Sequence, residues 1–151
     1  MVDRRAARIL AMQALCQFEV LHEDFAAQLD EFLAEDAPPQ ESRTYARGLV
    51  EEARRRLVEL DRHISEVAEH WDIKRMPSVD RNVLRVAVCE LLYRPEVPPV
   101  VVINEAVEIG KAFSTGESGA FINGVLDAIE KLRKQDGGKQ PEKSGVGNGT
   151  V

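Results

Sequence analysis

The chain has few of the residues that build redox centres, metal sites or membrane spans. It has 151 residues but two cysteines, Cys16 and Cys89, with no CxxC pair beside them. We expect both to be reduced thiols in a cytoplasmic protein. No apolar run approaches the ~18 residues that a membrane span needs. The three histidines, His22, His63 and His70, are dispersed. His63 and His70 could share one helix face, but two ligands make a poor metal site, so neither a metal nor a cofactor is predicted.

Catalytic motifs are also absent. There is no P-loop, no GxGxxG opening a strand–helix unit, no HExxH and no GxSxG. Carboxylates are plentiful, but no pair stands in an evidently apolar setting that would tune a general acid. The sequence therefore predicts a protein that is not an enzyme. Its net charge of −6 argues against a general nucleic-acid binder, so any such binding must come from a local basic patch.

What the chain does contain is helical periodicity. Aromatic residues make up only 5%, while helix formers dominate. The pattern predicts an all-α fold of six to seven helices, over about 3–21, 25–37, 42–71, 78–93, 99–113 and 118–133. The run 42–71 is too long for one helix, and we expect a break within 57–62. From residue 135 the chain has almost no apolar residues, and the tail 135–151 is expected to be disordered.

Several local signals refine these elements. Ser78 is a plausible N-cap for the helix that follows Pro77. The β-branched run 97–103 could be a strand, but it has no partner run, and Pro99 suits the first turn of a helix. Gly124 lies inside the last predicted helix, where such a glycine usually marks close helix packing.

The first predicted helix begins with a cluster of arginines, although the chain as a whole is acidic. On a helical wheel, one face gathers the residues Ala7, Leu10, Ala11, Ala14, Phe18 and Leu21. The opposite arc carries Arg4, Arg5, Arg8, Met12, Leu15 and Glu19. The helix dipole disfavours cations at an N-terminus, so local helix stability does not explain these arginines. We interpret them as an exposed patch for phosphate groups, which guanidinium groups bind bidentately. A solvated helix face is the plainer alternative, and Arg54, Arg55 and Arg56 could either extend the basic surface or form an ordinary charged face.

Three C-terminal segments resemble the NusB transcription antitermination family. They are VDRNVLRVAVCELLY at 79–93, the stretch from VPP at 97–99 to INEAVE at 103–108, and FINGVLD at 121–127. The start of the chain, RRAAR at 4–8 followed by AMQAL at 11–15, is similar to the arginine-rich start of that family. The resemblance covers roughly residues 4–132. It implies one NusB-like domain, 1–134, built of two three-helix-type subdomains that share one core, about 1–73 and 77–134.

The resemblance also implies a function and a set of site residues. It implies an RNA-binding adaptor that binds boxA RNA together with the ribosomal protein NusE. Through other Nus factors the adaptor would reach RNA polymerase and support transcription of rRNA operons. The positions that match the RNA-contacting residues of the family are Arg4, Arg5, Arg8 and Gln13. The positions that match its NusE-contacting acidic residues are Asp80 and Glu117. Cys16 stands where many members have an aromatic residue, and a lost stacking contact costs about 1–3 kcal/mol per base.

Two rival hypotheses stay open at this point. In one, the chain is a purely protein-binding helical scaffold whose arginines are solvated or paired with acidic groups. In the other, it is a piece of an RNA-modifying enzyme that carries a NusB-like domain, which the absence of a cofactor-binding region disfavours. The sequence leaves a monomer and a homodimer equally open.

Overall fold

A computed structural model describes residues 3–136, which form helices and no strand. The elements in chain order are α1 Arg4–Leu21, the 3-10 helix η1 His22–Gln28, α2 Leu29–Ala34, α3 Gln40–Arg55, α4 Leu57–Val67, the 3-10 helix η2 Ile73–Arg75, α5 Ser78–Tyr93, α6 Pro99–Phe113 and α7 Ser118–Gln135. The prediction of an all-α fold with six to seven helices is confirmed. Helix α7 reaches Gln135, the first residue of the predicted tail; positions 137–151 of that tail lie outside the described residues. Within 3–136, no helix is both long and apolar enough to cross a membrane.

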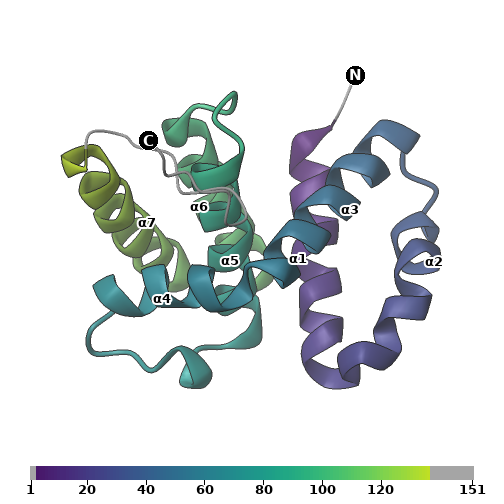
Figure 1. Cartoon of the computed structure of the whole chain (residues 1–151), viewed down its shortest axis with the longest axis horizontal. Helices are drawn as coiled ribbons and strands as arrows, with labels where there is room; N and C mark the ends of the chain where they lie inside the picture. The colour runs from purple at the N-terminus through teal and green to yellow at the C-terminus, as the bar shows by residue number, and fades with distance from the viewer. Residues whose placement is uncertain (1–2, 137–151) are drawn as a thin grey trace, which may run out of the picture.

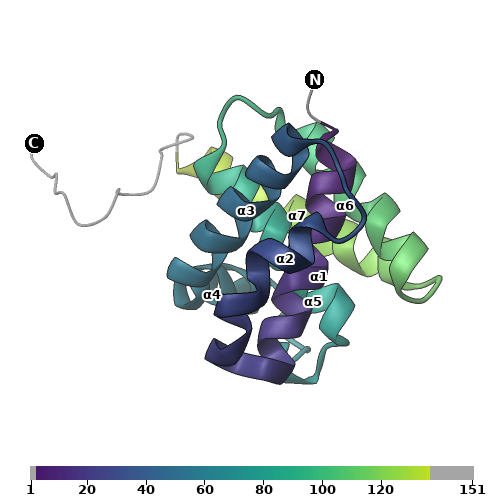
Figure 2. The same cartoon turned by 90° about the vertical axis from the view of Figure 1, so that its right-hand side faces the viewer.

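The helices form two groups around α5. Figure 1 shows α1, α2 and α3 on one side and α4, α6 and α7 on the other, with α5 between them. Seen from the side of α2, α1 lies behind it and packs on both α3 and α5 (Figure 2). Every residue from 82 to 92 in α5 is buried, and one continuous core joins both groups. Helix α4 packs on α5 and α7, although it falls in the predicted N-terminal half. The division into 1–73 and 77–134 stays a prediction.

The proline signals located the helix boundaries well. Pro99 occupies the first turn of α6, so the run 97–103 contributes to a helix and not to a strand. The long third run breaks at Arg56, one residue before the expected window. Helix α1 ends at Leu21, as predicted, where His22 adopts a φ of 54°; residues 22–24 then open the 3-10 helix η1. One local prediction is wrong. Ser78 is the first helical residue and makes no capping bond; its hydroxyl donates to Oε1 of Glu19 at 2.7 Å instead.

Close packing between α6 and α7 occurs at Gly110 and Gly119, and not at Gly124 as predicted. A Cβ at Gly110 would lie 2.4 Å from Cδ1 of Ile122, whereas a Cβ at Gly124 would meet nothing within 4 Å. Ile122 is fully buried and has little room to move. Glycines on both helices therefore let them approach each other: Gly110 on α6, and Gly119 on α7, where a Cβ would lie 3.0 Å from Cγ of Lys111.

This contrast predicts opposite effects for two alanine substitutions. Gly110→Ala should lower the free energy of unfolding, because overpacking costs about 1–3 kcal/mol and exceeds the gain of up to ~1 kcal/mol in helix propensity. Gly124 is exposed, so Gly124→Ala should raise the free energy of unfolding by about 0.5–1 kcal/mol. Urea melts of both variants beside the wild type measure the difference. Equal effects at the two positions would contradict the packing described.

Glu19 joins the C-terminal part of α1 to α5. Its carboxylate accepts bonds from Nε and Nη2 of Arg81, both at 2.7 Å, and from Nη1 of Arg85 at 2.8 Å. Arg85 in turn donates to both carboxylate oxygens of Asp61 on α4 at 2.8 Å. Burial alone would raise the pKa of Glu19, but the bonds from Arg81 and Ser78 outweigh it and lower the pKa to about 2. The network thus favours the ionised carboxylate in the folded chain.

The lowered pKa of Glu19 predicts a loss of stability in acid. Since the unfolded chain binds this proton near pH 4.5 and the folded chain only near pH 2, the stabilisation is complete above ~5 and is lost as the pH falls through 2. Glu19→Gln should flatten the dependence of unfolding free energy on pH between about 5 and 2, by up to roughly 3 kcal/mol at ~1.4 kcal/mol per pKa unit. Urea melts across that range test this. If the slope is unchanged, the bonds from the arginines do not lower the pKa of Glu19 in the folded chain.

Candidate nucleic-acid interface

The start of α1 is fixed in place by Asp3. The Asp3 side chain accepts a bond from the backbone N–H of Ala6 at 3.0 Å, and so caps the helix. Its own backbone N–H donates to Oγ of the buried Ser42 on α3 at 3.2 Å. A side-chain cap stabilises a helix by about 1 kcal/mol, and this one also ties α1 to its neighbour. Arg4 and Arg5 therefore start from a rigid backbone.

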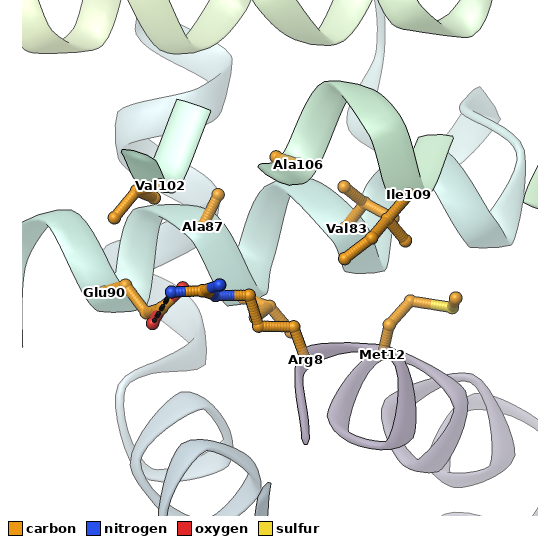
Figure 3. A pocket seen from close by; sticks show the side chains of 9 residues that line it. Arg8, Met12, Val83, Ala87, Glu90, Val102, Ala106 and Ile109 are labelled. Atoms are coloured by element: carbon orange, nitrogen blue, oxygen red, sulfur yellow. Dashed lines mark hydrogen bonds and ion pairs between the residues drawn. The ribbon is translucent and has the colours of Figure 1, made fainter. Parts of the chain in front are cut away.

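Arg8 is buried, so the prediction that it belongs to an exposed patch is wrong. Only 5% of the residue is exposed, and its partner Glu90 on α5 is 1% exposed. Nε and Nη2 of Arg8 donate to the two carboxylate oxygens of Glu90 at 2.7 and 3.1 Å. Figure 3 shows the Arg8 side chain reaching from α1 to Glu90 among apolar side chains that include Val102 and Ala106. The Arg8 guanidinium therefore has a structural role, because it pairs with a carboxylate between α1 and α5.

The helical wheel failed here because α1 is buried on two sides. It packs on both α3 and α5, and the arc that carries Arg8 meets α5 at Glu90. Met12 and Leu15, which the wheel placed on the outer arc, are 2% and 4% exposed. The exposed or partly exposed residues of α1 include a strip at four-residue spacing that holds Arg5, Ile9 and Gln13.

Arg5 is exposed but already holds a carboxylate. Its Nε and Nη2 donate to the two carboxylate oxygens of Glu105 on α6 at 2.8 and 2.7 Å. The side chain of Arg5 is 54% exposed and that of Glu105 is 21% exposed. The bond from Arg5 holds the pKa of Glu105 below its usual range. Because Nη1 of Arg8 lies 3.6 Å from the same carboxylate, Glu105 connects the exposed arginine to the buried one.

Arg4 lies on the other side of the helix start, over an aromatic ring. Its Cζ is 5.0 Å from the centre of the Tyr45 ring on α3. The Tyr45 hydroxyl donates to Oε2 of Glu90 at 2.6 Å, and burial together with this bond raises the tyrosine pKa. The Tyr45 side chain is thus held at its hydroxyl by Glu90, while Arg4 lies over its ring. Arg4, Arg5 and Tyr45 form the surface at the N-terminal end of α1, which we call the arginine end.

The second arginine cluster does not extend this surface. Arg54 pairs with Glu23 and lies over Phe18, its Cζ 3.8 Å from the ring centre. Arg55 and Arg56 both pair with Glu52. The alternative of an ordinary charged face, left open by the sequence, is the one observed.

The two acidic positions predicted to contact NusE have different surroundings. Asp80 is 5% exposed, and its carboxylate accepts bonds from Oγ of Ser118 at 2.9 and 3.0 Å. It therefore fastens the start of α7 to α5. Glu117 is the exposed residue just before Ser118. Asp80 is placed to shape the loop between α6 and α7, while Glu117 is placed on its surface.

Comparison with known proteins identifies the family. A sequence model of the NusB family matches residues 5–131. This chain belongs to the NusB family. Transcription antitermination protein NusB of Desulforapulum autotrophicum is 44% identical over 146 residues, which span 93% of this chain and 99% of that relative.

Solved NusB structures share the fold. NusB of T. maritima is 36% identical, with a TM-score of 0.74 over 87% of this chain and 93% of its own. A crystal structure of the antitermination factors NusB and NusE in complex with dsRNA contains a chain that is 32% identical, with a TM-score of 0.76 over 85% of this chain and 96% of its own. The resemblance seen in the sequence is confirmed. The chain thus belongs to a family of transcription antitermination factors, which are not enzymes.

Sequence reasoning missed the groups that hold this NusB-family arginine end. Glu90, Glu105 and Tyr45 were not singled out as its partners. For Glu90 a signal existed, because it is the one charged residue in the run 86–92, and a carboxylate in an apolar run is seldom buried unpaired.

Proposed function

We propose that the chain is a transcription antitermination adaptor that binds boxA RNA together with NusE. The pair acts in a complex of Nus factors with RNA polymerase and supports transcription of rRNA operons in the cytoplasm. The observation that carries this proposal is the arginine end of α1, a fixed cationic surface on an acidic chain. The related crystal structure of NusB and NusE with dsRNA supports NusE and RNA as the two kinds of partner.

The proposal gives each predicted residue a role. Arg4 and Arg5 bind phosphate groups, and Gln13 contacts the same strand further along the exposed strip. Arg8 is a positioning residue, because its guanidinium is occupied by Glu90. Glu117 contacts NusE, and Asp80 holds the loop that presents it.

The arginine end offers only two arginines, the exposed Arg5 and the partly exposed Arg4, which explains why a partner is needed. Each phosphate contact with a single strand contributes about −0.7 to the slope of log affinity against log salt, so two contribute about −1.4. A chain with net charge −6 and so few contacts should bind RNA weakly alone. NusE would supply further cations and contacts. Sequence-specific reading favours a single strand, whose bases are accessible.

Fluorescence anisotropy tests the proposal. The probes are a boxA-like single strand, a scrambled strand and a boxA duplex, each with and without NusE, at two salt concentrations. We expect preference for the boxA strand and stronger binding with NusE. Binding that is indifferent to sequence and to NusE would contradict the proposal.

One observation favours the second candidate, a protein-binding scaffold with no RNA site. Both Arg5 and Arg8 are engaged by carboxylates of the same chain, as a purely structural role requires. Neutralising Arg4 and Arg5 separates the two functions. If NusE binding persists and any RNA binding is indifferent to both the RNA sequence and these arginines, the arginines are structural and the scaffold is the better description.

A further inference from the structure

A groove lies beside the arginine end, between α3 and the end of α5. Its volume is about 480 Å³, within the range of about 300–1,000 Å³ typical of small-ligand sites. The residues that line it are Gln40, Glu41, Thr44, Tyr45, Gly48 and Arg94. Positions 41, 44, 45 and 48 follow helical spacing, so one stripe of α3 forms a wall of the groove. Arg94 faces this stripe from the residue that follows α5.

Gly48 keeps the groove open. A Cβ at this position would lie 3.6 Å from Nη2 of Arg94, which is an ordinary contact, so the backbone does not require glycine there. A longer side chain at 48 would project between α3 and Arg94. The Arg94 guanidinium is itself held, since Nη1 donates to the carbonyl oxygen of Tyr93 at 3.1 Å and lies 3.5 Å from Oε1 of Glu52.

Tyr45 connects the groove to the arginine end. Its ring lines the groove and also carries the Arg4 guanidinium. Its hydroxyl is bound to the buried Glu90, so the ring cannot swing away. A ring fixed before binding loses little conformational freedom when a flat ligand packs on it. Aromatic rings and guanidinium planes are the two protein surfaces on which unstacked RNA bases stack.

We propose that this groove is a subsite for one unstacked nucleobase of the bound RNA strand. The inference rests on the proposed function and extends it. The base enters between the stripe of α3 and Arg94 and packs against Tyr45. Arg94, which lines the groove, and Arg4, which lies over the Tyr45 ring, would neutralise the neighbouring phosphates. Thr44 and Gln40 offer hydrogen-bonding groups for the base edge. A duplex cannot fill the groove without extruding a base.

A matched pair of variants at Tyr45 tests the stacking. Both Tyr45→Phe and Tyr45→Leu lose the hydroxyl that binds Glu90, but only the phenylalanine keeps the ring. The assay is anisotropy with the boxA-like strand and NusE. We expect Tyr45→Leu to bind about 5- to 100-fold more weakly than Tyr45→Phe, with the same salt slope in both, since stacking carries no charge. Thermal melts of the two variants should agree.

A second variant does not depend on how the core tolerates leucine at 45. Gly48→Leu fills the groove from a helix surface and leaves every other residue in place. It should weaken RNA binding by a similar factor without lowering the melting temperature. Strands with a single abasic site, moved along boxA, should then show one position whose base matters to the wild type and not to Gly48→Leu.

The outcomes separate this inference from the proposed function. If Tyr45→Phe and Tyr45→Leu bind equally, or if Gly48→Leu binds as the wild type does, the nucleobase subsite is overturned. Should neutralisation of Arg4 and Arg5 still abolish binding in that case, the RNA adaptor stands and only the subsite fails. If no variant of any of these residues changes binding, both are wrong.

Discussion

Replacing Arg8 with methionine is expected to lower the free energy of unfolding by about 3–5 kcal/mol. The substitution keeps a long side chain but leaves the carboxylate of Glu90 buried without its cation. Taking a charge out of water costs several kcal/mol, and here the bond from Tyr45 would be the main compensation left. Urea or thermal denaturation followed by circular dichroism measures the loss.

A second substitution distinguishes the lost pair from lost packing. Adding Glu90→Gln to Arg8→Met removes the uncompensated charge, while the amide oxygen can still accept from Tyr45. We expect the double variant to recover most of the stability, because neutral replacement of both partners of a buried pair is often nearly neutral. If Arg8→Met alone costs less than about 1 kcal/mol, the buried pair described here is not the dominant interaction of Arg8. A double variant as unstable as the single one would point to packing.

The buried pair also decides which arginine variants can report on RNA. A charge reversal at Arg8 would place two carboxylates together in the core, next to Glu90. Loss of RNA binding in that variant would then reflect unfolding. Arg4 and Arg5 do not have this difficulty, because their side chains lie at the surface.

The fold could be predicted largely from local signals. Proline placed the start of α6, and the apolar spacing gave every long helix. What failed depended on neighbours remote in sequence. The wheel could not show that α1 has helices on two sides, although Met12 and Leu15 on its outer arc were a signal of it. The close contact of Gly110 with Ile122 likewise exists only once α6 and α7 are packed.

The candidate site was predictable only in part, for the same reason. Arginine clustering pointed to the N-terminal end of α1. It could not show that Glu105, a hundred residues later, binds Arg5, or that Glu90 draws Arg8 inward. Predicting these pairs needs the topology, because spacing within a helix carries no information on contacts between helices.

Neutralising the arginine end is expected to weaken RNA binding strongly without affecting the fold. Arg4→Gln with Arg5→Gln should lower the affinity for the boxA-like strand in the presence of NusE by about 10- to 100-fold near ~0.1 M salt. The salt slope should become shallower by about 1.4. Exposed pairs contribute little to stability, so the melting temperature should barely move. Arg47→Gln is the matched control, since Arg47 on α3 is a similarly exposed arginine that pairs with Asp30 on α2 and Glu51 on α3.

Neutralising Glu105 should strengthen RNA binding, which is the opposite of the effect expected for Arg4 and Arg5 on the same surface. Its carboxylate occupies the two donors of Arg5 that a phosphate would use, so a bound phosphate must displace it. Glu105→Gln weakens this competition and removes a negative charge from the binding surface. We expect it to raise affinity for the boxA-like strand about two- to fivefold, an effect that shrinks with salt. In the Arg4→Gln, Arg5→Gln background the gain should largely disappear. A gain of the same size in both backgrounds would mean that Glu105 repels RNA directly, and that its pairing with Arg5 plays no part in binding.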